Sequence, residues 1–122
     1  MDLQLKSEIA ALHARICSAL SDPNRILILC LLSDEPRNVS FLAEELELAQ
    51  PTVSRHLKIL RDRGLVYSKR EGQFVVYELS DHRIITALET LRSVVIEMLR
   101  EQAALAHTVS ERPLTKFEEK QK

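Results

Sequence analysis

The sequence predicts a mainly α-helical domain that carries one small β-hairpin. Only 2 glycines occur in 122 residues, and no repeat or low-complexity tract interrupts the chain. Apolar residues recur at steps of three and four residues toward both ends of the chain, which is typical of amphipathic helices. Between Leu65 and Leu79 the apolar spacing changes to two, which is typical of strands. The expected order is therefore four helices, two strands and a final helix.

The first two helices are expected on either side of Ser21-Asp22-Pro23. Upstream, the apolar residues form one stripe: Leu5, Ile9, Leu12, Ile16 and Leu20. Ser21 or Asp22 can cap a new helix, and Pro23 fits its first turn, where a missing N–H costs nothing. The second helix, about 23–33, contains ILILCLL and is apolar nearly all round, so we expect it to be the central buried helix.

A short helix and a longer helix are expected next, joined by a tight turn. Residues 34–37 are predicted as a loop, and Ser40 is expected to cap a helix over 41–46. The following helix is predicted over 51–63, with Gly64 as its stop signal. Its inward face should consist of Val53, Leu57 and Leu60.

The hairpin and the last helix complete the prediction. LVYSKR and QFVVYEL are rich in β-branched and aromatic residues, and Glu71-Gly72 between them indicates a turn. A long helix should begin near Asp81, and its apolar pattern fades after His107. We therefore expect a folded domain over residues 1–107 and a polar tail over residues 108–122.

Composition restricts the class of protein. Hydrophobic residues make up 45% of the chain and charged residues 29%, as in ordinary globular domains. No apolar run approaches the ~20 residues that span a bilayer, and the N-terminus lacks the pattern of a signal peptide, so we expect a cytoplasmic protein. Two cysteines cannot make a disulfide framework and should be thiols. No phosphate-binding glycine loop or catalytic cluster occurs, so we expect neither an enzyme nor a cofactor.

Charge is distributed unevenly, although the net charge is only −1. Residues 50–73 hold six basic and two acidic side chains, whereas residues 1–49 hold four basic and eight acidic ones. Such a local basic segment attracts a phosphate backbone.

Two helices joined by a tight turn and followed by a basic hairpin form a winged helix-turn-helix. The second helix of the pair fits the major groove of double-stranded DNA, so its outward side chains should bind bases and phosphates. The outward residues of this helix are Gln50, Thr52, Ser54, Arg55, His56 and Lys58, and those at the hairpin tip are Lys69, Arg70 and Gln73. A winged-helix module that binds another protein is the alternative.

The segments SDPNR and QPTVSRHLKILRDRGLV resemble the ArsR/SmtB family of bacterial repressors, and the resemblance extends over about residues 10–100. The resemblance implies a homodimer whose first and last helices pack across a two-fold axis. It also implies repression at a near-palindromic operator and release by an inducer, which the sequence does not identify. The family usually has Gly-Leu-Ser before Gln-Pro, whereas this chain has Glu47-Leu48-Ala49. Glu47 therefore stands where glycine would ease a left-handed conformation, and Ala49 stands where serine would cap the helix.

Neither metal site of the family is complete. The third helix, VSFLAEEL, lacks the cysteines of the thiolate site. On the last helix Asp81 and Glu97 match the second site, but Arg83 and Val94 replace its histidines. Two carboxylates without imidazole make a poor zinc site, so we expect Asp81 to cap the helix and no metal to bind there.

The candidate sensor residues are Cys30, Cys17 and His13. Cys30 matches one cysteine of the family members that respond to sulfide and persulfide, whereas Ser93 stands near their second cysteine. His13 and Cys17 share a helix face, a spacing that can hold a metal or activate a thiol. The alternatives are a thiol switch at Cys30, a non-standard metal site at His13 and Cys17 with His107, two cysteines buried in the core, and no small inducer at all.

Overall fold

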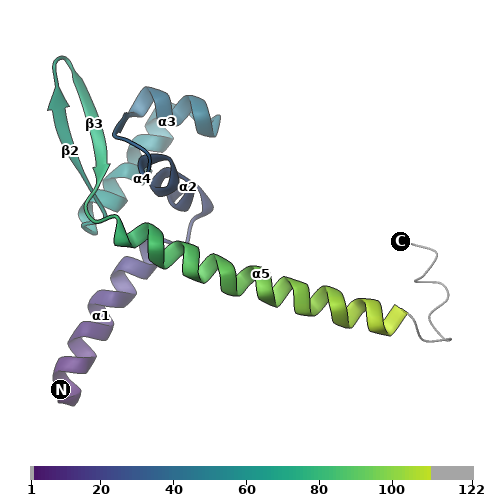
Figure 1. Ribbon diagram of the computed structural model, residues 1–122. Helices are drawn as coiled ribbons and strands as arrows, with labels where there is room; N and C mark the ends of the chain where they lie inside the picture. Colours follow the sequence, from purple (N-terminus) through teal and green to yellow (C-terminus); the bar gives the residue numbers. More distant parts are fainter. Residues whose placement is uncertain (1, 111–122) are drawn as a thin grey trace. The chain divides into compact units, whose positions relative to one another are not determined.

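The computed structural model describes residues 2–110, so most of the predicted tail lies outside the described residues. The structure confirms a mainly helical chain with a small antiparallel sheet. Its elements are α1 (Leu3–Ala19), α2 (Pro23–Leu32), β1 (Arg37–Asn38), α3 (Val39–Leu46), α4 (Gln50–Asp62), β2 (Val66–Glu71), β3 (Phe74–Leu79) and α5 (Arg83–Ser110) (Figure 1). The chain divides between Ile85 and Thr86 into two compact units.

The starts of α1 and α2 are capped by aspartates. The Asp2 carboxylate accepts a hydrogen bond from the Leu5 N–H at 2.7 Å, and the Asp22 carboxylate accepts one from the Asn24 N–H at 2.8 Å. Pro23 lies in the first turn of α2. The expected helix start at Ser21-Asp22-Pro23 is therefore confirmed, with Asp22 as the cap.

The segment before α3 differs from its prediction. Arg37, predicted as the last residue of a loop, forms β1 together with Asn38, and β1 pairs antiparallel with β3. Asn38 caps α3 in place of Ser40, since its side-chain oxygen accepts a hydrogen bond from the Phe41 N–H at 2.8 Å. The expected cap at Ser40 was wrong because pairing with β3 holds Asn38 in extended backbone, where asparagine caps a helix as well as serine does.

The turn between α3 and α4 has both features that its sequence suggested. Glu47 adopts the left-handed conformation, with φ 55° and ψ 45°. Ala49 is the N-cap of α4, and no side-chain hydrogen bond caps this helix. The two departures from the family pattern Gly-Leu-Ser thus mark a residue in the left-handed conformation and a helix start without a side-chain cap.

The hairpin, or wing, follows α4 directly. Gly64, with φ +77°, ends the helix, and Gly72, with φ +61°, lies in the tight turn of the wing. β2 and β3 lie side by side in the hairpin (Figure 1) and are paired from Val66 opposite Leu79 to Glu71 opposite Phe74. Since β1 pairs with the other edge of β3, β3 is the middle strand of the sheet. This register turns alternate wing side chains toward opposite faces.

The core lies among α2, α3, α4 and the base of the wing. Its most deeply buried large side chains are Ile28, Leu29, Leu32, Leu42, Val53, Leu57, Leu60 and Val66. The helix α2 contributes Ile28, Leu29 and Leu32 to the core, as expected of the central helix, but it is not buried on every side, because Leu27 is 48% exposed and Cys30 is exposed. Only one face of α2 packs within the first unit.

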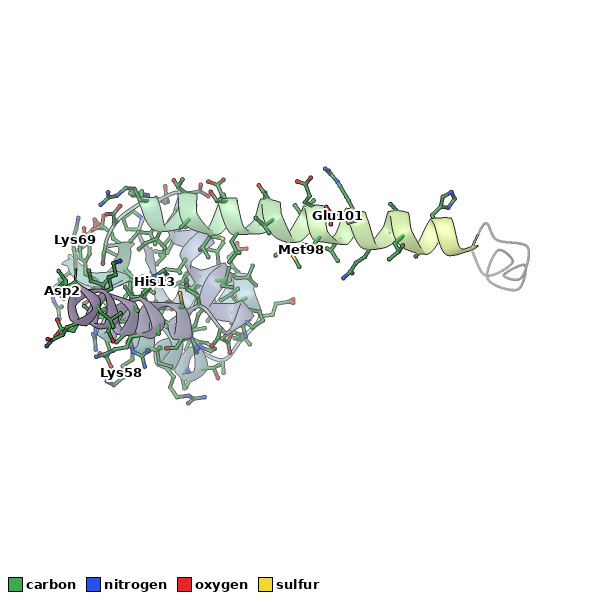
Figure 2. The ribbon with its side chains drawn as sticks, turned by 90° about the horizontal axis from the view of Figure 1, so that it is seen from below. Asp2, His13, Lys58, Lys69, Met98 and Glu101 are labelled. Carbon is green, nitrogen blue, oxygen red and sulfur yellow. The ribbon has the colours of Figure 1, made fainter. Side chains whose placement is uncertain are left out.

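Two helices expose their apolar stripes. On α1 the exposed stripe is Leu5, Ile9, Leu12 and Ile16, and on α5 the exposed apolar residues include Leu91, Val94, Val95, Met98, Leu99 and Leu105. Figure 2 labels His13 on α1 and Met98 on α5. None of the helices in residues 2–110 combines the length and apolar character needed to cross a membrane.

Candidate nucleic-acid interface

The core sets the rotation of α4 about its own axis. Val53, Leu57 and Leu60 are all 0% exposed, and they form the inward face that the sequence predicted. Because these residues recur at steps of four and three, the opposite side of the helix must point outward.

The outward side of α4 carries hydrogen-bonding and basic side chains. Ser54, Arg55 and Lys58 are exposed, and Thr52 is half-buried. The Arg55 guanidinium donates a hydrogen bond to the Thr52 hydroxyl at 3.3 Å, so these two side chains lie together on the surface. Lys58 projects from the periphery of the first unit (Figure 2). Arginine, serine, threonine and lysine at these positions can contact base edges and phosphates.

An acidic residue that the prediction left out also lies on this helix. The Lys58 ammonium donates a hydrogen bond to the Asp62 carboxylate at 3.0 Å. This hydrogen bond holds the pKa of Asp62 below its usual value, so the carboxylate is charged at neutral pH. The four-residue spacing from Lys58 to Asp62 is the signal that could have identified the pair.

Gln50 lies at the first turn of α4 and is exposed. Its side-chain amide donates a hydrogen bond to the Ser40 hydroxyl at 3.2 Å, which joins the start of α4 to the start of α3. Gln50 therefore presents its amide near the N-terminus of α4, where a phosphate would also be stabilised by the helix dipole.

His56 does not lie on the outward side. It is half-buried, and its Nδ1 atom is 3.3 Å from the Arg25 guanidinium of α2. A guanidinium can only donate a hydrogen bond, so Nδ1 accepts it. The structure thus separates His56 from the other predicted DNA-binding residues of α4, because the position next to the inward face brings it against α2.

The wing presents its predicted residues on different faces. Lys69, Arg70 and Gln73 are all exposed. Lys69 forms an ion pair with Glu78 across the strands at 3.4 Å, whereas Arg70 projects from the other face of the hairpin. Glu78 is a second acidic partner that the prediction left out, and it reduces the free charge of the wing.

The sensor candidates have different surroundings from those of core residues. Cys17 and Cys30 are exposed free thiols, so the alternative that both are buried within one chain was wrong. The exposure of Cys30 did not follow from the sequence, because the apolar residues on all sides of α2 do not show which side faces the core. Within residues 2–110, no group of three or more His, Cys, Asp and Glu side chains of one chain is arranged to hold a metal ion.

Asp81 is engaged at the start of α5. Its carboxylate accepts a hydrogen bond from the Arg83 N–H at 2.8 Å and another from the Arg83 guanidinium at 2.7 Å. These bonds lower the pKa of Asp81 to about 2. The other residue of the incomplete metal site, Glu97, lies exposed on α5.

Comparisons with known proteins agree with this geometry. Residues 22–68 match the family model of the bacterial regulatory proteins of the arsR family. The transcriptional regulator NmtR of Mycobacterium tuberculosis is 39% identical over 85 residues, which cover 70% of this chain and 71% of NmtR. The transcriptional activator HlyU of Vibrio cholerae is 36% identical over 91 residues, which cover 75% of this chain and 84% of HlyU.

A solved structure shows the same fold. The winged helix-turn-helix DNA-binding domain of Mb0332 from Mycobacterium bovis, described as homodimeric, superposes with a TM-score of 0.71 at 28% identity. The match covers 79% of this chain and 89% of that one. The residues 22–68 that match the family model include α2, α3 and α4, and α4 carries most of the candidate DNA-binding side chains. The chain belongs to the ArsR family of bacterial transcriptional regulators.

Proposed function

We propose that this protein is a homodimeric repressor that binds a near-palindromic operator in double-stranded DNA and leaves it when an inducer arrives. The main support for this proposal is that α4 has one buried apolar face and an opposite face of polar and basic side chains. Its inward residues are completely buried, whereas its outward residues are hydrogen-bond donors and cations that are exposed, except for the half-buried Thr52. A helix of this kind at the protein surface fits a major groove.

The proposed DNA-binding residues form two groups. Gln50, Thr52, Ser54, Arg55 and Lys58 of α4 contact base edges and phosphates in the major groove, and Lys69, Arg70 and Gln73 of the wing contact neighbouring phosphates or the minor groove. Arg55 is the side chain best suited to read a guanine, because its exposed guanidinium can donate two parallel hydrogen bonds. His56 is left out of the first group, since it faces Arg25.

The dimer is proposed to form through α1 and α5. The exposed stripe on α1 holds Leu5, Ile9, Leu12 and Ile16, and α5 exposes a broad apolar band. Long apolar stripes on surface helices are typical of subunit interfaces. The Mb0332 domain, which is described as homodimeric, supports a dimer for this chain as well.

The proposed inducer acts at the Cys30 thiol. An exposed thiol is accessible to oxidants and reactive sulfur species. Hydrogen peroxide would convert the Cys30 thiolate to a sulfenic acid and be reduced to water, and a second thiol, such as Cys17, would then displace water to form a disulfide. The alternative is a metal site that uses His13 and Cys17 with ligands from elsewhere in the dimer, such as His107.

The first experiment tests DNA binding itself. The wild-type protein selects duplexes from a pool with a randomised centre, and fluorescence anisotropy measures affinity for the selected duplex across a salt series. We expect a palindromic consensus and an affinity that falls steeply with salt. Arg55→Ala should weaken binding by about tenfold or more. Arg55→Lys keeps the charge and should retain the salt dependence while losing discrimination at one base pair.

Other results would contradict the proposal. If no consensus emerges and Arg55→Ala binds as the wild type does, the chain is a protein-interaction module. A reporter gene behind the selected duplex tests the direction of regulation, because a repressor lowers its expression. Higher expression would indicate an activator, which is how the relative HlyU is described.

A second experiment tests the inducer. The protein–DNA complex is challenged separately with hydrogen peroxide, persulfide, zinc and arsenite. Release by peroxide or persulfide in the wild type, and its loss in Cys30→Ser, would support the thiol switch. Unchanged release in Cys30→Ser would refute it. Loss of release in Cys17→Ser as well would identify Cys17 as the second thiol, whereas retained release would show that Cys30 does not need it. A zinc- or arsenite-dependent rise in melting temperature that disappears in Cys17→Ser would instead support the metal site.

A further inference from the structure

The C-terminal end of α1 is bound by two arginines from other elements. The Arg63 guanidinium donates hydrogen bonds to the Arg15 carbonyl oxygen at 2.7 Å and to the Ser18 hydroxyl. The Arg25 guanidinium donates one to the Ala19 carbonyl oxygen at 2.7 Å. The last turn of α1 contains no basic residue of its own. Because a helix C-terminus carries partial negative charge, these two cations stabilise it from outside, and Arg25 also pairs the carbonyl of the last helical residue, Ala19.

The same two arginines belong to α4 or contact it. Arg63 is the C-cap residue of α4, and Arg25 lies 3.3 Å from His56 on that helix. His56 and Arg63 are about two helical turns apart. The end of α1 is therefore connected to α4 at two points along the α4 axis, and two points of attachment restrict both the tilt of a helix and its shift along its axis.

Few other contacts within the first unit hold α1. Within Leu3–Ala19, only Ala19 is buried, and the apolar stripe of α1 is exposed. The stripe does not pack against α2, α3 or α4, so the orientation of α1 depends on its C-terminal end. The arginine bonds there account for most of the polar contacts between α1 and the helices that carry the candidate interface.

We propose that Arg63 and Arg25 are positioning residues that hold α4 in a fixed relation to α1 and so set the separation of the two α4 helices in the dimer. The inference rests on the proposed function, in which α1 contributes to the dimer interface and α4 binds DNA. Arg63 acts through the carbonyl and hydroxyl of α1 and contacts no DNA. Arg25 acts through α1 and His56, which gives the half-buried histidine a role in place of base contact.

The expected consequence is a strict requirement for half-site spacing. Half-sites of a dimeric repressor lie about one helical turn apart, and each added base pair rotates one half-site by roughly 35° and moves it by about 3.4 Å. A dimer with rigidly held α4 helices cannot follow this change. A dimer in which α4 moves freely relative to α1 can follow it, at the cost of weaker binding to the best spacing.

The experiment compares spacings rather than single affinities. Full-length wild type and Arg63→Ala are titrated against the palindromic duplex that the wild type selects, and against duplexes with one base pair added or removed at the centre. For the wild type we expect losses of about tenfold or more at the altered spacings. For Arg63→Ala we expect about fivefold weaker binding to the best spacing and differences within about twofold among spacings. The salt dependence should be unchanged, since no phosphate contact is lost.

Two further variants separate positioning from charge. Arg61→Ala removes the same charge from an exposed position on the last turn of α4 and should keep the wild-type spacing profile. Ser18→Ala removes one of the two acceptors of Arg63 on α1 without changing any charge. The bond to the Arg15 carbonyl oxygen is kept, so the dependence on spacing should weaken in the same direction but by less than in Arg63→Ala. Because Ser18 is proposed to act on α4 through Arg63, Ser18→Ala should add little when it is combined with Arg63→Ala. Light scattering confirms that each variant is a dimer at the assay concentration, and circular dichroism confirms that it is folded.

The possible outcomes decide the inference. The inference is overturned if the affinity of Arg63→Ala depends on half-site spacing as strongly as that of the wild type. It is also overturned if Arg61→Ala loses this dependence. If Arg63→Ala loses its fold or its dimer, Ser18→Ala decides by the same criterion. Failure of the proposed function is recognised separately, because the wild type itself would then select no palindrome.

Discussion

The uncapped start of α4 provides a sharp test of how local geometry controls the candidate DNA-binding helix. Ala49 already has the extended backbone of an N-cap, with φ −66° and ψ 144°. A threonine at this position can place its hydroxyl over the first turn, whereas valine has the same shape and no acceptor. We therefore expect Ala49→Thr to stabilise the protein relative to Ala49→Val.

The size of the effect follows from the hydrogen bonds of the first turn. Pro51 occupies the second position of α4 and has no N–H, so the new hydroxyl can accept only from Thr52. The Thr52 N–H already donates to the Ala49 carbonyl oxygen at 3.0 Å, so the hydroxyl shares this donor. We expect a gain in the lower half of the usual range for a cap, about 0.5–1 kcal/mol. For a chain of this length that corresponds to a melting temperature about 2–4 °C higher.

The assay is thermal and urea-induced unfolding of both variants at equal protomer concentration, since dimerisation makes stability depend on concentration. An equal urea slope shows that the extent of unfolding is unchanged. If Ala49→Thr is no more stable than Ala49→Val, the hydroxyl does not cap α4, and the reasoning from backbone conformation to capping is refuted.

Three other predictions concern the turn, the charge of α4 and the start of α5. Glu47→Val should lower the free energy of unfolding by about 1–2 kcal/mol, because a β-branched residue is strained at positive φ, whereas Glu47→Gly should be neutral or slightly stabilising. Urea unfolding measures both variants. Equal stability of Glu47→Val and Glu47→Gly would contradict the strain. Asp62→Asn should free the Lys58 ammonium to bind phosphate, so binding to an unrelated duplex at low salt should strengthen severalfold. The slope of log affinity against log salt concentration should steepen by up to about one unit. An unchanged slope would place Lys58 away from DNA. The carboxylate of Asp81 has a folded-state pKa of about 2, below its ordinary value of 3.8, so its stabilising contribution is present above pH 3.8 and is lost as pH falls through 2. The difference in melting temperature between wild type and Asp81→Asn should therefore be constant near neutral pH and shrink over that acidic range, and a difference independent of pH would refute the role of the Arg83 bonds.

Much of the fold was predictable because its signals are local. The order of helices followed from apolar spacing, and the inward face of α4 followed from three residues at helical steps. The wing followed from a change of period and a glycine turn. β1 was missed because two residues carry no periodicity, and they form a strand only where β3 is present to pair with them.

The candidate interface was predicted less completely than the fold. The exposed positions of Arg55 and Lys58 followed from helical geometry alone. The place of His56 did not, because a residue at the edge of the inward face points to solvent or to a neighbour according to what packs beside it. Here Arg25 of α2 lies beside it. The exposure of Cys30 was missed for a related reason, since apolar neighbours in the sequence do not reveal which side of a helix has a partner in the same chain.

By itself, the sequence determined the junctions at which neighbouring residues decide the backbone. Asp22, one of the two expected caps, begins α2, and Gly64 ends α4 as expected; both depend on bonds that span only a few residues. The left-handed Glu47 was indicated by the family's glycine at its position. Only the tertiary structure decided that Arg63 binds the end of α1, where its acceptor on Arg15 is 48 positions away. Long guanidinium side chains can reach many acceptors, and packing of the core determines which acceptor lies within hydrogen-bonding distance.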